Sequence, residues 1–176
     1  MTDAELADAL RRHAYLEGDF VLRSGRRSRY YLDKYRFETR PELLEALGAR
    51  IAQKVAEAEP QAGRLAGPEL GAVALAAAAS LSSRLPFLIV RKEAKEYGTA
   101  NRLEGDFAEG DRVCLIEDVV TSGGAAVEAV RALREAGLEC RTAVCVVDRE
   151  EGGVDALARV GVRLWPLFRA GDIRPA

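Results

Sequence analysis

The chain has 176 residues, 48% of them hydrophobic and 31% charged, which is the composition of an ordinary globular domain large enough to bury a core. A formal net charge of -2 excludes the overall basic field of a typical nucleic-acid-binding protein. No apolar run is long enough to span a membrane, and residues 1–5 lack the apolar core of a signal peptide. We therefore expect a single domain over residues 1–176, located in the cytoplasm, with no nucleic-acid or membrane partner.

The N-terminal part of the chain combines helical and hairpin patterns. Apolar residues at helical spacing predict a helix over residues 3–16. Residues 19–37 are rich in aromatic and basic side chains, and they predict a hairpin or an irregular hood around Ser24 and Gly25. Pro41 stands where a proline favours the first turn of a helix, so a second helix is expected to begin there.

Strand and helix patterns then alternate along the rest of the chain. Strand-like segments lie at 64–67, 86–91, 112–117, 141–148 and 162–167, and helical patterns lie at 70–84, 124–136 and 153–160. This alternation predicts an α/β fold with a mainly parallel sheet that is covered by helices on both faces. Ligands of such sheets bind at the carboxyl ends of the strands. The polar residues 92–111 interrupt the alternation, and we expect them to form a long, mobile, functional loop.

Residues 113–125 carry the strongest chemical signal. An apolar strand pattern ends in Glu117 and Asp118, and we expect both side chains to turn into one site because the strand stops there. Residues 121–125 form a Thr/Ser/Gly turn before a helix, whose hydroxyls and free amides can hold a phosphate monoester. Two acids beside such a loop suit ribose hydroxyls, directly or through Mg2+. The plainer alternative is a helix capped by a Thr or Ser side chain, with both acids solvated.

The chain has neither a Walker-type nor a dinucleotide-binding glycine motif, which excludes those two kinds of nucleotide site. Segment 113–125 instead resembles the phosphoribosyl-pyrophosphate (PRPP) motif of type I phosphoribosyltransferases. In that family the two acids contact the ribose hydroxyls and the loop holds the 5-phosphate. The resemblance implies a type I phosphoribosyltransferase fold and a catalytic role for Asp118. It implies PRPP binding by Glu117, Asp118, Val119, Val120, Thr121, Ser122, Gly123, Gly124 and Ala125. The implied cofactor is Mg2+, expected mainly through PRPP, with no separate metal site on the protein.

A basic segment opens the expected loop. Arg91, Lys92 and Lys95 suit a polyanion such as pyrophosphate, although by themselves they fit a solvated charged loop equally well. The segment resembles the catalytic loop R-K-x-x-K-x-H-G of orotate phosphoribosyltransferases, which implies PRPP contacts by these three residues and Tyr97, and a catalytic role for Lys95. Tyr97 stands where many members have histidine; its phenol can donate a hydrogen bond but carries no positive charge. In that family the loop enters the neighbouring active site, so a homodimer that exchanges loop 91–105 is implied.

Two further segments point to the base. Residues 20–33 by themselves predict an ordinary basic hairpin, but they resemble the F-x-L-x-S-G-x-x-S-x-Y-Y hood that covers the base in the orotate family. The resemblance implies a hood formed largely by residues 18–38, with Arg23 and Tyr31 close to orotate.

Arg149 follows another strand pattern, and an arginine there can form a bidentate pair with a carboxylate. A surface cluster of ion pairs is the alternative. The segment resembles the family's D-R-x-E sequence, which implies that Arg149 binds orotate, with Thr121 as a second contact. Residues 66–72 match the position of the family's pyrophosphate loop. Some relatives place a lysine where Gly71 stands, so any contact here would come from the backbone.

Together these resemblances imply an orotate phosphoribosyltransferase. This pentosyltransferase joins PRPP and orotate into orotidine 5'-monophosphate and pyrophosphate, in de novo pyrimidine synthesis. Two alternatives stay open. A purine phosphoribosyltransferase would share segment 113–125 but would not need Arg149. A regulatory relative that binds RNA would keep the PRPP motif and lose catalysis.

Overall fold

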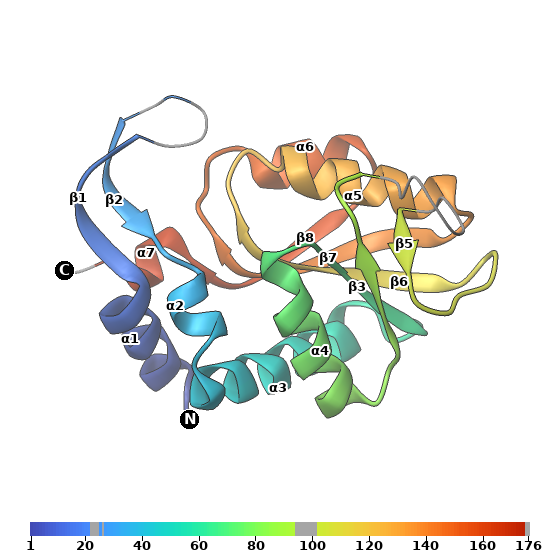
Figure 1. Ribbon diagram of the computed structural model, residues 1–176, viewed down its shortest axis with the longest axis horizontal. Coiled ribbons are helices and arrows are strands. Elements are labelled where there is room, and N and C mark those ends of the chain that lie inside the picture. Colours follow the sequence, from blue (N-terminus) through green and yellow to red (C-terminus); the bar gives the residue numbers. More distant parts are fainter. Residues whose placement is uncertain (22–24, 26, 94–101, 175–176) are drawn as a thin grey trace.

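A six-stranded sheet forms the centre of the chain in the computed structural model, which describes residues 1–21, 25, 27–93 and 102–174 (Figure 1). The strand order is β5-β4-β3-β6-β7-β8. The strands are β3 (Arg64–Pro68), β4 (Phe87–Val90), β5 (Leu103–Glu104), β6 (Arg112–Val120), β7 (Glu139–Asp148) and β8 (Arg163–Arg169). Neighbouring strands are parallel except for β4 and β5. The prediction of a mainly parallel α/β sheet is confirmed.

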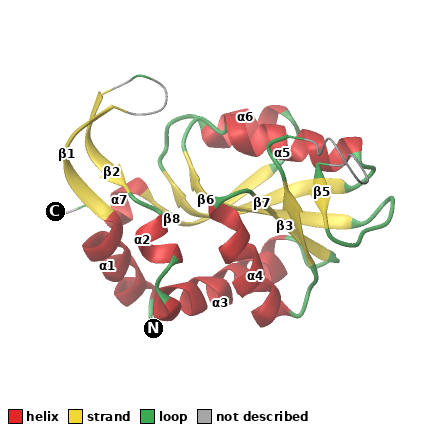
Figure 2. Cartoon of the chain, viewed as in Figure 1, coloured by secondary structure: helices red, strands yellow, loops and turns green. Residues whose placement is uncertain are grey.

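Helices cover both faces of this sheet (Figure 2). The helices are α1 (Asp3–Ala14), α2 (Tyr35–Glu38), α3 (Pro41–Ala58), α4 (Gly71–Ser83), α5 (Gly124–Glu135), α6 (Gly153–Arg159) and α7 (Ala170–Ile173). Side chains alternate across β6, so Ile116 packs in the core with α3 and α4, while Leu115 packs in the core with α5 and α6. The two apolar cores hold the sheet between them.

A small N-terminal unit stands at the carboxyl end of this sheet. Strands β1 (Tyr15–Val21) and β2 (Arg27–Leu32) form a separate antiparallel pair, and α2 leads from this pair into α3. Helix α1 ends at Ala14, two residues earlier than predicted, because Tyr15 and Leu16 pair with Leu32 and Tyr31. We call residues 15–38 the hood; it begins before the predicted hairpin and includes a short helix.

Two sequence predictions are corrected by the sheet. Strand β6 does not stop at the two acids but continues to Val120, because the β-branched residues Val119 and Val120 pair with Val147 and Asp148 of β7. The segment expected to be wholly loop contains β5, which forms because Leu103 is buried against the sheet beside Val90. Residues 94–101 lie outside the described part of the chain. No helix within the described ranges is long and apolar enough to cross a membrane.

Candidate active site

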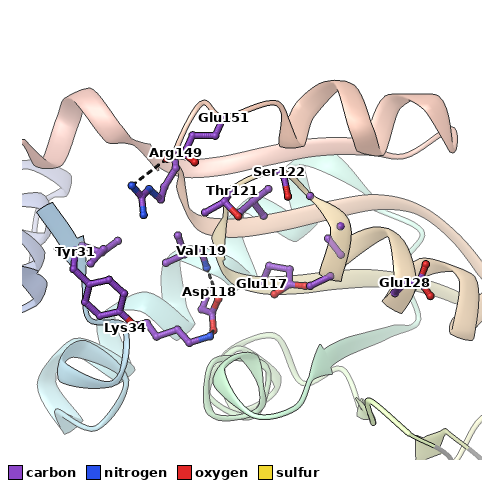
Figure 3. Close-up of a pocket in the computed structure, with 16 residues that line it drawn as sticks. Tyr31, Lys34, Glu117, Asp118, Val119, Thr121, Ser122, Glu128, Arg149 and Glu151 are labelled. Atoms are coloured by element: carbon purple, nitrogen blue, oxygen red, sulfur yellow. Dashed lines mark hydrogen bonds and ion pairs between the residues drawn. The ribbon is translucent and has the colours of Figure 1, made fainter. Parts of the chain in front are cut away.

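A cavity of about 830 Å³ opens between the hood and the carboxyl ends of β6 and β7 (Figure 3). One continuous segment, residues 117–126, supplies most of its wall. The remaining lining residues are Tyr31, Leu32, Lys34, Glu128, Arg149 and Glu151. The fold therefore brings the acidic strand end, the Thr/Ser/Gly turn, the hood and the predicted base-binding arginine to one place.

The two acids of β6 are buried rather than solvated. Glu117 is 7% exposed and Asp118 is 4% exposed. Burial, together with the neighbouring charge of Asp118, raises the pKa of Glu117 to about 8, and its Oε1 has no hydrogen-bond partner among the described residues. At neutral pH Glu117 is therefore mostly protonated, and it can donate a hydrogen bond to a ligand hydroxyl.

Asp118 is paired with a lysine that the motifs did not single out. Lys34 Nζ donates to Asp118 Oδ2 over 2.6 Å (Figure 3). Burial alone would lower the pKa of Lys34, but the charge of Asp118 and the hydrogen bond to it outweigh burial and raise that pKa. Asp118 thus stands in the cavity with a fixed counter-charge.

The turn after β6 leads into a helix whose first amides are uncapped. Gly123 adopts φ +82°, a left-handed conformation that suits glycine, and no side chain within the described residues caps α5. A Cβ atom on Gly123 would lie 3.0 Å from Gly153 Cα, so the turn packs closely on the start of α6. The free amides at the N-terminus of α5 suit an anion, and the alternative of a Thr or Ser cap with solvated acids is not what the structure shows.

Arg149 lies on the opposite side of the cavity, at the carboxyl end of β7. Its side chain is 7% exposed, and its Nη2 donates to Glu151 Oε1 over 3.0 Å. The guanidinium carbon lies 4.6 Å from the centroid of the Tyr30 ring, which stacks on Tyr15 at 5.2 Å. The Arg149 Nε is buried without a partner among the described residues. A buried guanidinium with an unused donor is suited to a planar carboxylate.

The hood supplies aromatic and aliphatic surface to this side. Tyr31 lines the cavity, is 40% exposed, and packs against Phe20 with ring centroids 5.6 Å apart. Leu32 also lines the cavity and is buried. The predicted contact of Arg23 lies outside the described residues.

Comparison with known proteins identifies the family of this chain. The family model for the phosphoribosyl transferase domain matches residues 37–162. A curated orotate phosphoribosyltransferase of Halobacterium salinarum is 47% identical over 98% of this chain and 97% of its own length. That of Methanocella arvoryzae is 45% identical over 97% of both chains. The crystal structure of Mycobacterium tuberculosis orotate phosphoribosyltransferase in complex with PRPP gives a TM-score of 0.82 at 29% identity, covering 97% of this chain and 98% of that chain.

The chain belongs to the orotate phosphoribosyltransferase family. Its type I phosphoribosyltransferase fold agrees with the expectation from the motifs. The motif residues from Glu117 to Ala125, which include Thr121, all line one cavity together with Arg149 and Tyr31.

The basic loop of the orotate phosphoribosyltransferase pattern is only partly described. Arg91 Nη1 lies 3.5 Å from Glu104 Oε1, and the backbone N–H of Lys92 donates to Glu69 Oε1 over 2.7 Å. Neither Arg91 nor Lys92 lines the cavity. Lys95 and Tyr97 lie outside the described residues.

Sequence reasoning missed Lys34, the acidic Glu128 and Glu151, and also Glu38, which is 4% exposed beside Asp118. Lys34 and Asp118 are 84 positions apart, so no local pattern connects them. The one signal available was that Lys34 lies within the predicted hood, residues 19–37.

Proposed function

We propose that this protein transfers the phosphoribosyl group of PRPP to orotate, giving orotidine 5'-monophosphate and pyrophosphate in de novo pyrimidine synthesis. One observation carries the proposal: a single cavity joins uncapped helix amides, two buried acids and a buried arginine. These groups suit, in turn, a phosphate, a ribose and a ring carboxylate. Orotate carries a ring carboxylate that Arg149 can bind, whereas uracil has none.

PRPP is placed along residues 117–125. The 5-phosphate lies at the amides of the turn and of the first residues of α5, where the helix dipole favours negative charge. The ribose hydroxyls lie at the two acids, with Glu117 donating and Asp118 accepting hydrogen bonds. Val119 and Val120 form the strand between the acids and the turn.

Orotate is placed between Arg149 and the hood. Its carboxylate accepts hydrogen bonds from the Arg149 guanidinium, and the Thr121 hydroxyl provides a second contact beside the phosphate turn. Tyr31 and Arg23 cover the ring from the hood side. This places the base between groups that differ in chemistry from those that hold the sugar.

The reaction breaks the bond between C1 of the ribose and the pyrophosphate oxygen, and that electron pair leaves with pyrophosphate. The orotate ring nitrogen supplies the pair for the new bond to C1, and its N–H proton passes to the departing pyrophosphate, so no strong base on the protein is needed. The transition state has oxocarbenium character, and the carboxylate of Asp118 stabilises its positive charge. Arg91, Lys92, Lys95 and Tyr97 contact the pyrophosphate, and Lys95 acts as the catalytic cation on the leaving group.

Mg2+ is the cofactor that this chemistry calls for, and the donors of the cavity fit it. The ion is commonly held by one or two carboxylates together with substrate phosphates. Asp118 supplies a carboxylate of this kind and Glu117 a neutral carboxyl oxygen, while the described residues contain no group of three or more His, Cys, Asp or Glu side chains that could hold a metal by themselves. We propose that Mg2+ enters with PRPP, where it neutralises part of the pyrophosphate charge.

The same proposal extends to the assembly. Residues 1–176 would form one catalytic domain whose hood, mainly residues 18–38, closes over the base. A homodimer would exchange loop 91–105, so that Lys95 of one subunit serves the cavity of its neighbour. The enzyme would act in the cytoplasm on these two small substrates.

The test is base choice. Purified protein is incubated with PRPP, Mg2+ and each of orotate, uracil, adenine and xanthine, and pyrophosphate release is measured. Release with orotate alone is expected. Release with a purine would favour the purine enzyme, and no release with any base would favour a regulatory protein. Orotate-dependent release that survives unchanged in Arg149→Gln would contradict the placement of the base.

A further inference from the structure

Lys34 is the cation of the cavity that no motif accounts for. Its ammonium lies 2.6 Å from Asp118 Oδ2, and the side chains are 31% and 5% exposed respectively. The backbone carbonyl of Lys34 accepts hydrogen bonds from the N–H groups of Phe37 and Glu38, which fixes the start of α2 beneath it. In Figure 3 the lysine side chain extends from the hood side of the cavity to the carboxylate. The ion pair with Asp118 therefore holds the Lys34 ammonium at one position in the cavity.

The charges around Asp118 make this contact necessary. Glu117 precedes Asp118 in β6, and Glu38 of α2 lies near enough for the charge of Asp118 to raise its pKa. All three carboxyl groups are at most 7% exposed. Lys34 is the cation that acts on both Glu38 and Glu117 within the described structure. A buried carboxylate without a partner is strongly disfavoured, and Lys34 is the partner that contacts Asp118 at 2.6 Å.

The backbone at the start of α4 lies directly against this ion pair. A Cβ atom on Gly71 would lie 1.8 Å from Asp118 Oδ2 and 2.7 Å from Lys34 Nζ. No larger residue fits there unless the ion pair moves. The position of the ion pair is therefore fixed by the hood on one side and by the start of α4 on the other.

We propose that Lys34 is a positioning residue of the PRPP site, which holds the Asp118 side chain aimed at the ribose hydroxyls. The inference rests on the proposed function and deepens it, because it assigns to the hood a part in sugar binding as well as in covering the base. Lys34 acts through Asp118, so its removal should weaken PRPP binding only where Asp118 is present to be misplaced.

The test is a double-mutant cycle on PRPP binding, with affinities measured by titration calorimetry in the presence of Mg2+. Lys34→Met should weaken PRPP binding by about tenfold or more, the size of one charge-assisted hydrogen bond. In the Asp118→Asn background the same substitution should change the affinity by less than about twofold. Lys34→Gln keeps a donor without the charge and should fall between wild type and Lys34→Met. The Michaelis constant for orotate at saturating PRPP should stay near the wild-type value.

Lys54 offers a matched control. Its side chain is 30% exposed and forms an ion pair with Glu57 at 2.8 Å, close to the values for Lys34, but it lies on α3 away from the cavity. Lys54→Met should bind PRPP as wild type does. If Lys34→Met also binds PRPP within about twofold of wild type, or loses the same factor in both Asp118 backgrounds, the proposal is wrong.

A second variant serves if Lys34→Met fails to give a cooperative thermal transition. Gly71→Ala keeps both charges but pushes the pair apart, and it should also weaken PRPP binding about tenfold. Gly63→Ala is its control, because the nearest atom to a Cβ at that position is 3.9 Å away. Wild-type affinity in Gly71→Ala would overturn the proposal. Since the cycle measures PRPP binding without a base, it remains decisive even if the enzyme proves to use a base other than orotate.

Discussion

The half of the cavity that we propose binds the sugar is built mainly from one continuous segment, whereas the half that we propose binds the base is assembled from parts that are distant in sequence. We call them the sugar half and the base half. Residues 117–126 lie on β6, the turn after it and the start of α5, and β6 pairs with β3 on one side and β7 on the other. On the base side, Arg149 follows β7, while Tyr30 and Tyr31 come from a two-stranded sheet that pairs with no other described strand. The first half is anchored in the core, and the second is held by contacts between side chains.

This difference indicates how strongly each half should respond to substitutions. The acids of β6 are at most 7% exposed and cannot shift without disturbing the pairing of β6 with β7. Tyr31 of the hood is 40% exposed, and Arg149 depends on a stacked ring for its orientation. We therefore expect substitutions in the sugar half to affect the reaction strongly, and those in the base half to act in graded steps on orotate.

The largest effect is expected for Asp118→Asn. The substitution keeps the shape of the side chain but removes the negative charge that faces the ribose, so kcat/KM should fall roughly 100-fold, as for other preorganised electrostatic contacts. Steady-state assays with varied PRPP would measure it. Asp155→Asn, at an exposed position on α6, is the control and should retain activity. Activity of Asp118→Asn within a few-fold of wild type would remove Asp118 from the catalytic residues.

Arg149→Gln should separate the two halves. Loss of a charge-assisted pair costs about 2 kcal/mol, which corresponds to a roughly thirtyfold rise in the KM for orotate. The KM for PRPP should change little, because the sugar side does not contact this side chain. Equal increases in both constants would show that the halves are not independent.

Tyr30 tests how far the base half depends on stacking. Tyr30→Leu removes the ring beside the Arg149 guanidinium, and a cation–π contact of about 0.7 kcal/mol corresponds to a roughly threefold rise in the KM for orotate. Tyr30→Phe keeps the ring and loses only the hydroxyl that accepts from Arg174 over 3.1 Å, so its KM should stay near that of wild type. If the two variants behave alike, the ring does not orient Arg149.

The smallest effect on turnover, and a clear one on stability, is expected for Glu38→Gln. Burial and the nearby charge of Asp118 raise the pKa of Glu38 from 4.5 to about 8. Between about pH 5 and pH 8 the unfolded chain has lost this proton while the folded protein keeps it, so the free energy of unfolding falls as the pH rises through this window. Below the window both states are protonated, and above it the loss is complete.

Urea unfolding of the ligand-free protein at several pH values from 5.5 to 8.5 would measure this slope. Glu38→Gln should make the slope shallower, and Glu117 should account for the part that remains, since its pKa is also raised to about 8. Glu42→Gln is the control because Glu42 is exposed and its pKa is lowered, below this window. An unchanged slope in Glu38→Gln would contradict the raised pKa.

Local patterns were sufficient to predict the sheet and to single out the segment from Glu117 to Ala125 that lines the cavity. Pro41 begins α3 as expected, and Gly137, with φ +86°, follows the end of α5 and donates to Arg134. The acids and the phosphate turn were found because they are consecutive in sequence. The extension of β6 to Val120 was missed because pairing with β7 outweighs the presence of two carboxyl groups in a strand.

The base half could not be predicted from local pattern. Arg149 and Tyr30 contact each other through the fold, and only the resemblance to a known family suggested a role for Arg149. Lys34 and Glu38 were missed for the same reason, since their partner Asp118 is brought to them by the docking of the hood on the sheet. Burial, which sets the pKa of Glu38 and Glu117, also depends on the complete tertiary structure.

The close approach of Gly71 to the ion pair has an evolutionary consequence. Because a Cβ atom at position 71 would overlap Asp118 Oδ2 and crowd Lys34 Nζ, the residues at positions 34 and 71 cannot change independently. A lineage that replaces Lys34 first passes through an Asp118 carboxylate with no counter-charge, and one that first acquires a side chain at position 71 forces that side chain onto Asp118 Oδ2 and Lys34 Nζ. We expect the two positions to covary among homologues, with a lysine at one position or the other but not at both.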